Sequence, residues 1–181
     1  MAFFSYSQNY QGFIDIVIND PERYLPIVQF LDNISGQSSE LSKAEKELVG
    51  AYVSVLNECE FCYDEAMAKS FQVDEEVLLA LKHNVETAPI SSKIKSILRL
   101  TRKVTEQPNK IVESDIQNVV NSGWNEKTAE DVIAIASMYA FLNRIVDGFG
   151  LKGSSQYFSA MSEGFSNYDG YEAFVRSAIK G

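Results

Sequence analysis

Cys59 and Cys62 are the two thiols of the chain, and they stand three residues apart. On a helix this spacing brings both side chains to one side, close enough to form a small disulfide loop. Such a pair can cycle between dithiol and disulfide, because one thiolate attacks a peroxide or a disulfide and the other thiol resolves the product. The pair therefore predicts redox chemistry that needs no bound cofactor.

The reactive form is the thiolate, and an unperturbed cysteine has a pKa of about 8.5. The local sequence suggests Asn57 as the cap of a second helix, with Glu60 as its third-position partner. Cys59 would then lie closer than Cys62 to the positive end of that helix. This argument alone predicts that Cys59 is the easier thiolate.

Two other interpretations of the cysteines need weighing. A structural zinc site uses four Cys or His ligands, whereas this chain has two cysteines and one histidine, His83. We therefore expect no metal site. The remaining alternative is that both cysteines are small core residues, since Cys is among the most buried residue types.

Composition excludes several classes of function. A length of 181 residues with 45% hydrophobic content fits one ordinary domain, which we expect to span 1–181. The net charge of −9 argues against a nucleic-acid partner. Residues 1–8 do not resemble a signal peptide, and the apolar run Val132–Leu142 is roughly half the ~20 residues of a membrane span. We expect a cytoplasmic protein with no membrane partner, and reduced thiols.

The periodicity of apolar residues predicts an all-α fold without β-strands. Pro21 suits a first helical turn, and Ser42 with Glu45 forms a capping box that opens a helix. Gly123 and Gly148 stand where helices should stop. Further helices are predicted at Asp74–Asn84, Ser91–Glu106, Ser114–Asn121, Thr128–Asp147, Ser155–Phe165 and Tyr171–Ile179.

Two segments of the chain repeat one another faintly. Leu48–Asn57 and Ala134–Asn143 share an apolar pattern and a closing Leu-Asn pair. Two helical halves of related design would explain this similarity, and so would chance. Between the two segments, Trp124 follows a Ser-Gly pair and is expected to be a buried anchor at a turn.

Three stretches of sequence resemble one known family. Leu41–Tyr63, Ser122–Trp124 and Phe141–Gly150 are similar to motifs of the carboxymuconolactone decarboxylase / alkylhydroperoxidase D-like family, in particular its peroxidase-related branch. The resemblance covers about residues 20–152 and leaves 153–181 as a helical extension. It implies an all-α multi-helix bundle that assembles into homo-oligomers, as a dimer, trimer or hexamer.

The resemblance also implies roles for three residues. Glu47 occupies the place of the glutamate that starts a proton relay, Cys62 that of the cysteine that attacks peroxide, and Cys59 that of the cysteine that resolves it. We follow this order over the dipole argument, because a positioned base can outweigh a partial charge. A straight helix would hold Glu47 about 18 Å from Cys59, so the relay requires the chain to break near Asn57 and Glu58.

The sequence departs from the family pattern at the histidines. Phe61 and Ala66 stand where the peroxidase members carry imidazoles that relay protons. None of Tyr63, Glu65 and Lys69 is a convincing replacement.

We predict a thiol-dependent antioxidant oxidoreductase that reduces hydroperoxides or exchanges disulfides with an external dithiol reductant. The alternative is a catalytically degenerate relative that acts as a binding or structural oligomer. Lactone decarboxylation is a third, weaker alternative, because its usual pocket groups are not visible in the sequence.

Overall fold

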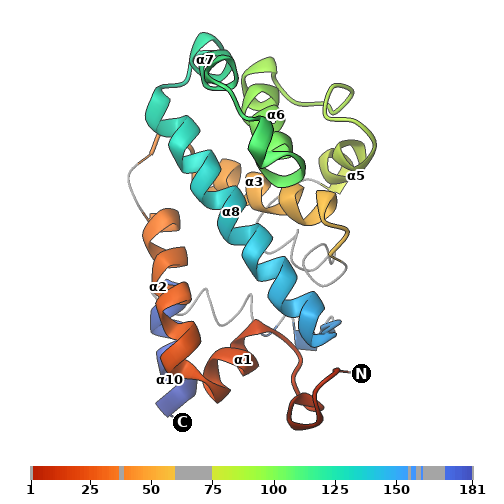
Figure 1. Cartoon of the computed structure of the whole chain (residues 1–181), viewed down its shortest axis with the longest axis vertical. Coiled ribbons are helices and arrows are strands. Elements are labelled where there is room, and N and C mark those ends of the chain that lie inside the picture. Colours follow the sequence, from red (N-terminus) through yellow and green to blue (C-terminus); the bar gives the residue numbers. More distant parts are fainter. Residues whose placement is uncertain are drawn as a thin grey trace.

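The structure is a computed structural model that describes residues 2–36, 39–59, 75–154, 156, 157, 160 and 170–180. Every regular element in these ranges is helical, which confirms the predicted all-α class (Figure 1). The elements are η1 (Ser5–Ser7), α1 (Phe13–Asn19), α2 (Pro21–Gly36), α3 (Lys43–Leu56), α5 (Glu75–His83), α6 (Ser92–Glu106), η3 (Pro108–Lys110), α7 (Glu113–Asn121), α8 (Glu126–Phe149) and α10 (Tyr171–Lys180). The helix predicted over 155–165 falls almost wholly outside the described residues.

The long helix α8 runs through the middle of the molecule and contacts α3, α6 and α7 (Figure 1). Helices α2 and α10 lie side by side at one end of the fold, together with α1. The other end is formed by α5, α6 and α7. Helix α10 comes from the predicted extension beyond residue 152, so the C-terminal part of the chain returns to pack on its N-terminal helices.

The main hydrophobic core lies where α3, α6 and α8 meet. Tyr52, Val53, Ile97, Leu98 and Val132 are fully buried in it. Burial of side chains of this size stabilises the fold by about 1.5–3 kcal/mol each relative to exposure. A second cluster, at the end of α8, contains Cys59, and a third joins α1, α2 and α10.

The beginning of α3 is set by the capping box that the sequence predicted. The Ser42 hydroxyl oxygen accepts from the Glu45 backbone N–H at 3.3 Å, and Glu45 Oε2 accepts from the Ser42 backbone N–H at 2.7 Å. Both contacts satisfy N–H groups that a helix start leaves without intrahelical partners.

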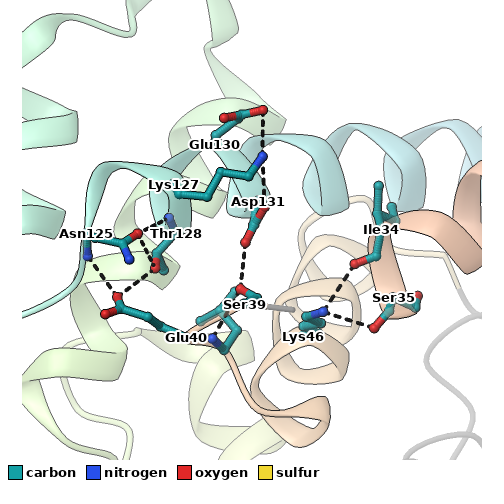
Figure 2. Close-up of polar contacts among 11 residues, drawn as sticks. Ile34, Ser35, Ser39, Glu40, Lys46, Asn125, Lys127, Thr128, Glu130 and Asp131 are labelled. Atoms are coloured by element: carbon teal, nitrogen blue, oxygen red, sulfur yellow. Dashed lines mark hydrogen bonds and ion pairs between the residues drawn. The ribbon is translucent and has the colours of Figure 1, made fainter. Parts of the chain in front are cut away.

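Polar contacts around residues 39–46 tie three helices together, as Figure 2 shows. The buried Lys46 Nζ donates to the carbonyl oxygens of Ile34 and Ser35 at 3.3 and 2.9 Å, at the C-terminal end of α2. A cation there meets the negative end of the helix dipole. Lys46 therefore fixes α3 against α2 at the turn of α3 that also carries Glu47.

The first turn of α8 is held by residues 39 and 40, in the linker between α2 and α3 (Figure 2). Glu40 Oε2 accepts from the Asn125 backbone N–H at 2.9 Å and from the Thr128 hydroxyl at 3.0 Å. Ser39 Oγ donates to Asp131 at 2.5 Å. A carboxylate at a helix N-terminus is favoured by the helix dipole, so these contacts set where α8 begins relative to α3.

Trp124 is buried, as predicted, and anchors the turn before α8. Its ring nitrogen donates to the Lys93 carbonyl at 3.0 Å, and Lys93 Nζ lies 3.8 Å from the ring centroid. The predicted stop at Gly148 is wrong, because α8 continues to Phe149. Gly150 adopts φ +70° there, and its N–H bonds to the carbonyls of Val146 and Asp147.

Helix α8 has 24 residues and contains a window with a mean hydropathy of 1.4, so by length and composition it could cross a membrane. A core helix of a soluble bundle meets the same criteria. Helix α8 packs against α3, α6 and α7, and 33% of its apolar window is buried inside the structure. The buried side chains along it include Val132, Ile135, Ala136, Met138 and Val146.

Gly50 makes the close contact between α3 and α8 possible. A Cβ at this position would overlap the ring of Tyr139, whereas a Cβ at Gly148 would meet nothing within 4 Å. We expect Gly50→Ala to lower the free energy of unfolding by about 1–3 kcal/mol through overpacking. Gly148→Ala, the matched control, should raise it by about 0.5–1 kcal/mol, because alanine is the better helix former. Urea denaturation of both variants checks this, and equal effects would contradict it.

Candidate functional site

Glu47 is a buried acid near the start of α3, with 5% of its surface exposed. The Tyr139 hydroxyl of α8 donates to Glu47 Oε2 at 2.7 Å. The Tyr171 hydroxyl of α10 lies against the other carboxyl oxygen, Oε1, at 3.4 Å, which is a longer and weaker hydrogen bond. Three helices that are far apart in the sequence thus meet at one carboxyl group.

Burial raises the pKa of the Glu47 carboxyl above the ordinary value of 4.5. The hydrogen bond from Tyr139 opposes this rise first, followed by the charge of Lys43, the hydrogen bond from Tyr171 and the charge of Lys46. The pKa of Tyr171 is held well above its usual range by burial and then by the Glu47 charge, so its hydroxyl stays protonated and can donate. An acid with a raised pKa is suited to proton exchange nearer neutral pH.

Helix α3 ends in a Schellman motif directly before Cys59. The Glu58 N–H bonds to the Val55 carbonyl, and the Cys59 N–H bonds to the Ser54 carbonyl at 3.1 Å. Glu58 has φ +55°, a left-handed conformation that is uncommon for residues with a side chain. The chain therefore turns away from the helix axis at Asn57 and Glu58, where the relay hypothesis required a break.

The prediction that Asn57 is the N-cap of a second helix is wrong. Asn57 has helical dihedral angles, φ −85° and ψ −1°, and is the C-cap of α3, whereas an N-cap is extended. Its side-chain nitrogen donates instead to Asn143 Oδ1 on α8 at 2.8 Å. The Asn57 side chain, which the local pattern suggested for capping a helix, is therefore used in a contact between α3 and α8.

Asn143 connects α3 and α8 a second time. Its side-chain nitrogen donates to the Ser54 hydroxyl oxygen at 3.1 Å, and the Ser54 hydroxyl donates to the Gly50 carbonyl at 3.1 Å. Asn57 and Asn143, which close the two similar sequence segments, are thus hydrogen-bonded to each other. That the two segments belong to two helical halves of related design stays a prediction, with chance similarity as its alternative.

Cys59 is fully buried among apolar side chains that include Ile16, Val146 and Leu151. The argument that made Cys59 the easier thiolate assumed the positive N-terminal end of a helix beside it. In the described residues, the helix end next to Cys59 is instead the C-terminal end of α3. Both the negative end of that helix and the apolar surroundings disfavour a charged sulfur. Cys62, together with Glu60, Phe61, Tyr63, Glu65, Ala66 and Lys69, lies outside the described residues.

Glu47 and Cys59 occupy different ends of the α3–α8 contact. The Ser54 carbonyl that receives the Cys59 N–H lies seven residues beyond Glu47, about 10 Å along the helix axis. A proton moving between them has to cross that distance through intervening groups or water. His83 is exposed at the end of α5 and does not line this contact. Within the described ranges, no three potential metal ligands come together.

Comparison with solved structures decides the fold. The chain superimposes with a TM-score of 0.70 on the alkylhydroperoxidase AhpD core of an uncharacterized peroxidase-related protein from Ralstonia eutropha JMP134, at 20% identity, covering 79% of this chain and 76% of the other. The fold is AhpD-like. A peroxidase-related protein from Silicibacter sp. TM1040 matches with a TM-score of 0.72 at 20% identity, covering 80% and 77% of the two chains.

The AhpD-like fold confirms the resemblance noted in the sequence. Among curated proteins, the uncharacterized protein YdfG of Bacillus subtilis (strain 168) is 25% identical over 134 residues, which cover 73% of this chain and 90% of YdfG. No protein-family profile matches the sequence. Sequence reasoning proposed Glu47 as a site residue but did not name Tyr139 or Tyr171, because no local pattern connects tyrosines 92 and 124 residues away to that acid.

The raised pKa of Glu47 predicts how stability depends on pH. Above the ordinary glutamate value, the native protein holds a proton that the unfolded chain releases, so this carboxyl makes stability fall as pH rises through its folded pKa. Glu47→Gln removes the penalty of a buried charge. We expect the melting temperature of Glu47→Gln minus that of the native chain to be higher at pH 7 than at pH 4.

The control for this measurement is Glu22→Gln, which changes an exposed carboxyl at the start of α2. Its melting temperature should follow that of the native chain at both pH values. A Glu47→Gln variant whose difference from the native chain does not change with pH would contradict a buried titrating acid.

Proposed function

We propose that this protein is a thiol-dependent oxidoreductase of the alkylhydroperoxidase type, which uses Cys59 and Cys62 as a redox pair and Glu47 as the proton acceptor. The observation that carries the proposal is a carboxyl buried in an AhpD-like fold, with a raised pKa and two tyrosine hydroxyls against it. A buried acid is costly for stability, and buried acids with raised pKa values cluster at sites of proton transfer.

The proposed cycle balances atoms and electrons. The thiolate of Cys62 attacks the outer oxygen of the hydroperoxide, the O–O bond breaks, and the released alkoxide takes up a proton as the alcohol leaves. The sulfenic acid formed on Cys62 then reacts with the Cys59 thiol, releasing water and forming the disulfide. An external dithiol reduces this disulfide by exchange and so supplies the two electrons that the peroxide consumed.

The buried position of Cys59 fits the resolving role rather than the attacking one. A resolving thiol acts only after the first sulfur has been oxidised, so it does not need prior access to the oxidant. Its surroundings disfavour a thiolate before that step, which leaves the first attack to Cys62. The proton released by Cys62 would pass toward Glu47 through groups or water that bridge the contact between α3 and α8.

A second candidate function is a non-catalytic relative that binds a ligand or forms a structural oligomer. It is favoured by the full burial of Cys59 and by Phe61 and Ala66 in the places of the family's histidines. In this case both thiols would be ordinary and slow to react. The homo-oligomer, the cytoplasmic location, and the lack of metal and cofactor remain predictions under either function.

Peroxide consumption tests the leading proposal. With cumene hydroperoxide and a dithiol reductant, Cys62→Ser should fall to the rate without enzyme, and Cys59→Ser should lose turnover while a sulfenic acid on Cys62 becomes trappable by dimedone. Glu47→Gln should slow turnover by about 10²-fold or more. His83→Ala, which removes an exposed imidazole, serves as the control with full activity. Equal rates for the native chain and Cys62→Ser would eliminate the proposal.

Thiol alkylation separates the two candidate functions. In the redox enzyme, iodoacetamide should modify Cys62 at pH 6 much faster than Cys59, because the buried thiol is protected from the reagent. Mass spectrometry of the peptide that contains both residues gives the two rates. Slow modification of both thiols at pH 6, with ordinary rates after unfolding, would favour the non-catalytic relative.

A further inference from the structure

Two tyrosine hydroxyls from different helices converge on the single buried carboxyl of Glu47. Tyr139 of α8 approaches Oε2 at 2.7 Å, and Tyr171 of α10 approaches Oε1 at 3.4 Å. Each carboxyl oxygen therefore has its own hydroxyl. An ionised carboxylate can only accept hydrogen bonds, and two donors satisfy it well.

Opposing effects act on this carboxyl. Burial favours the protonated acid, whereas the two hydroxyls and the positive charges of Lys43 and Lys46 favour the carboxylate. Among the described residues, the groups that act on Glu47 are thus the charges of two lysines of its own helix and the hydroxyls of one tyrosine from α8 and one from α10. Removal of either hydroxyl should move the balance toward the protonated form.

Tyr139 is held in place by its packing. Its ring covers Gly50, one turn beyond Glu47 on α3, in space that any side chain at position 50 would fill. The ring therefore lies directly against α3, and its hydroxyl reaches the carboxyl as a consequence of the close contact between the two helices.

Tyr171 is held in place by Asp32 of α2. The two carboxyl oxygens of Asp32 accept from the backbone N–H groups of Tyr171 and Glu172, each at 2.6 Å, at the first turn of α10. Gly170 has φ +96°, and a Cβ there would come within 2.9 Å of the Asp32 carboxyl. Asp32 thus fixes the backbone from which the Tyr171 side chain extends.

The rest of α10 supports this attachment. Val175 is fully buried against Val17 of α1 and Val28 of α2, and Gln29 donates to Glu172 at 2.8 Å. Helix α10 belongs to the stretch beyond residue 152, outside the part of the sequence that resembles the family. One of the two hydroxyls at Glu47 therefore comes from the C-terminal extension.

We propose that Tyr139 and Tyr171 are positioning residues that set the protonation state of Glu47. Asp32 contributes by fixing the first turn of α10, so that the Tyr171 hydroxyl reaches the carboxyl. The extension then does more than cover the bundle, because it completes the hydrogen bonding of the acid. The consequence for catalysis rests on the function proposed above, whereas the protonation of Glu47 can be measured without turnover.

Infrared difference spectroscopy tests the proposal directly. The carboxylic-acid C=O band that is lost in Glu47→Gln reports the protonated acid, and its pH titration gives a midpoint for Glu47. We expect Tyr139→Phe to move this midpoint upward, and Tyr171→Phe to move it upward by less because its hydrogen bond is longer. Asp32→Asn should move the midpoint in the same direction as Tyr171→Phe. The double variant that combines Asp32→Asn with Tyr171→Phe should move it no further than Tyr171→Phe alone.

Tyr52→Phe is the matched control. Tyr52 is fully buried on the same helix as Glu47, and its hydroxyl has no hydrogen-bond partner among the residues that the structure describes. Its removal should leave the midpoint unchanged. If neither Tyr139→Phe nor Tyr171→Phe moves the midpoint, or if Tyr52→Phe moves it as much, the proposal is overturned. If Asp32→Asn unfolds the chain, Tyr171→Phe decides, because it keeps the ring and its packing.

The pH profile of peroxide turnover separates this proposal from the function on which its catalytic part rests. If the profile of Tyr139→Phe shifts together with the infrared midpoint, both are supported. If the midpoint moves and the turnover profile does not, Tyr139 and Tyr171 still set the protonation of Glu47, and the relay role of Glu47 is rejected.

Discussion

The close approach of α3 and α8 is the contact on which the rest of the structure depends. It requires a residue without a side chain at Gly50, because the ring of Tyr139 occupies that space. The same approach brings the Tyr139 hydroxyl to Glu47 and lets Asn143 reach Ser54 and Asn57. Packing and polar contacts at this interface are therefore one feature, and a wider separation of the helices would lose both.

Polar groups in this interface give it specificity. A hydrophobic contact alone tolerates sliding of one helix along another, whereas buried hydrogen-bonding groups are satisfied at one register only. Glu47 with Tyr139 fixes one end of the contact, and Ser54 with Asn143 fixes the other. Lys46 and the linker at residues 39–40 hold α3 to α2 and to the start of α8 in the same way (Figure 2).

The site combines a buried acid with a buried thiol at opposite ends of this contact. Cys59 follows a Schellman turn that includes a left-handed Glu58, so the chain leaves α3 abruptly and carries the thiol into the second apolar cluster. Among the described residues, the negative end of α3 and the apolar side chains around Cys59 both oppose a charged sulfur. The geometry thus places a buried thiol at one end of the contact and a buried carboxyl at the other.

Local sequence determined much of this protein. The capping box of Ser42 and Glu45 and most helix boundaries follow from contacts within a few residues, so single-sequence patterns predicted them. The burial of Trp124 was also predicted, whereas its hydrogen bond to the Lys93 carbonyl joins residues 31 positions apart and was not. Glu47 was proposed as a site residue through motif resemblance, and its burial was seen only in the structure. Tertiary structure decided the rest: Asn57 has the local surroundings of a helix cap, but a residue 86 positions away on α8 pairs with its side chain. The partners of Glu47 come from α8 and α10, and only folding brings those hydroxyls to it, because hydrogen bonds between distant segments leave no local pattern.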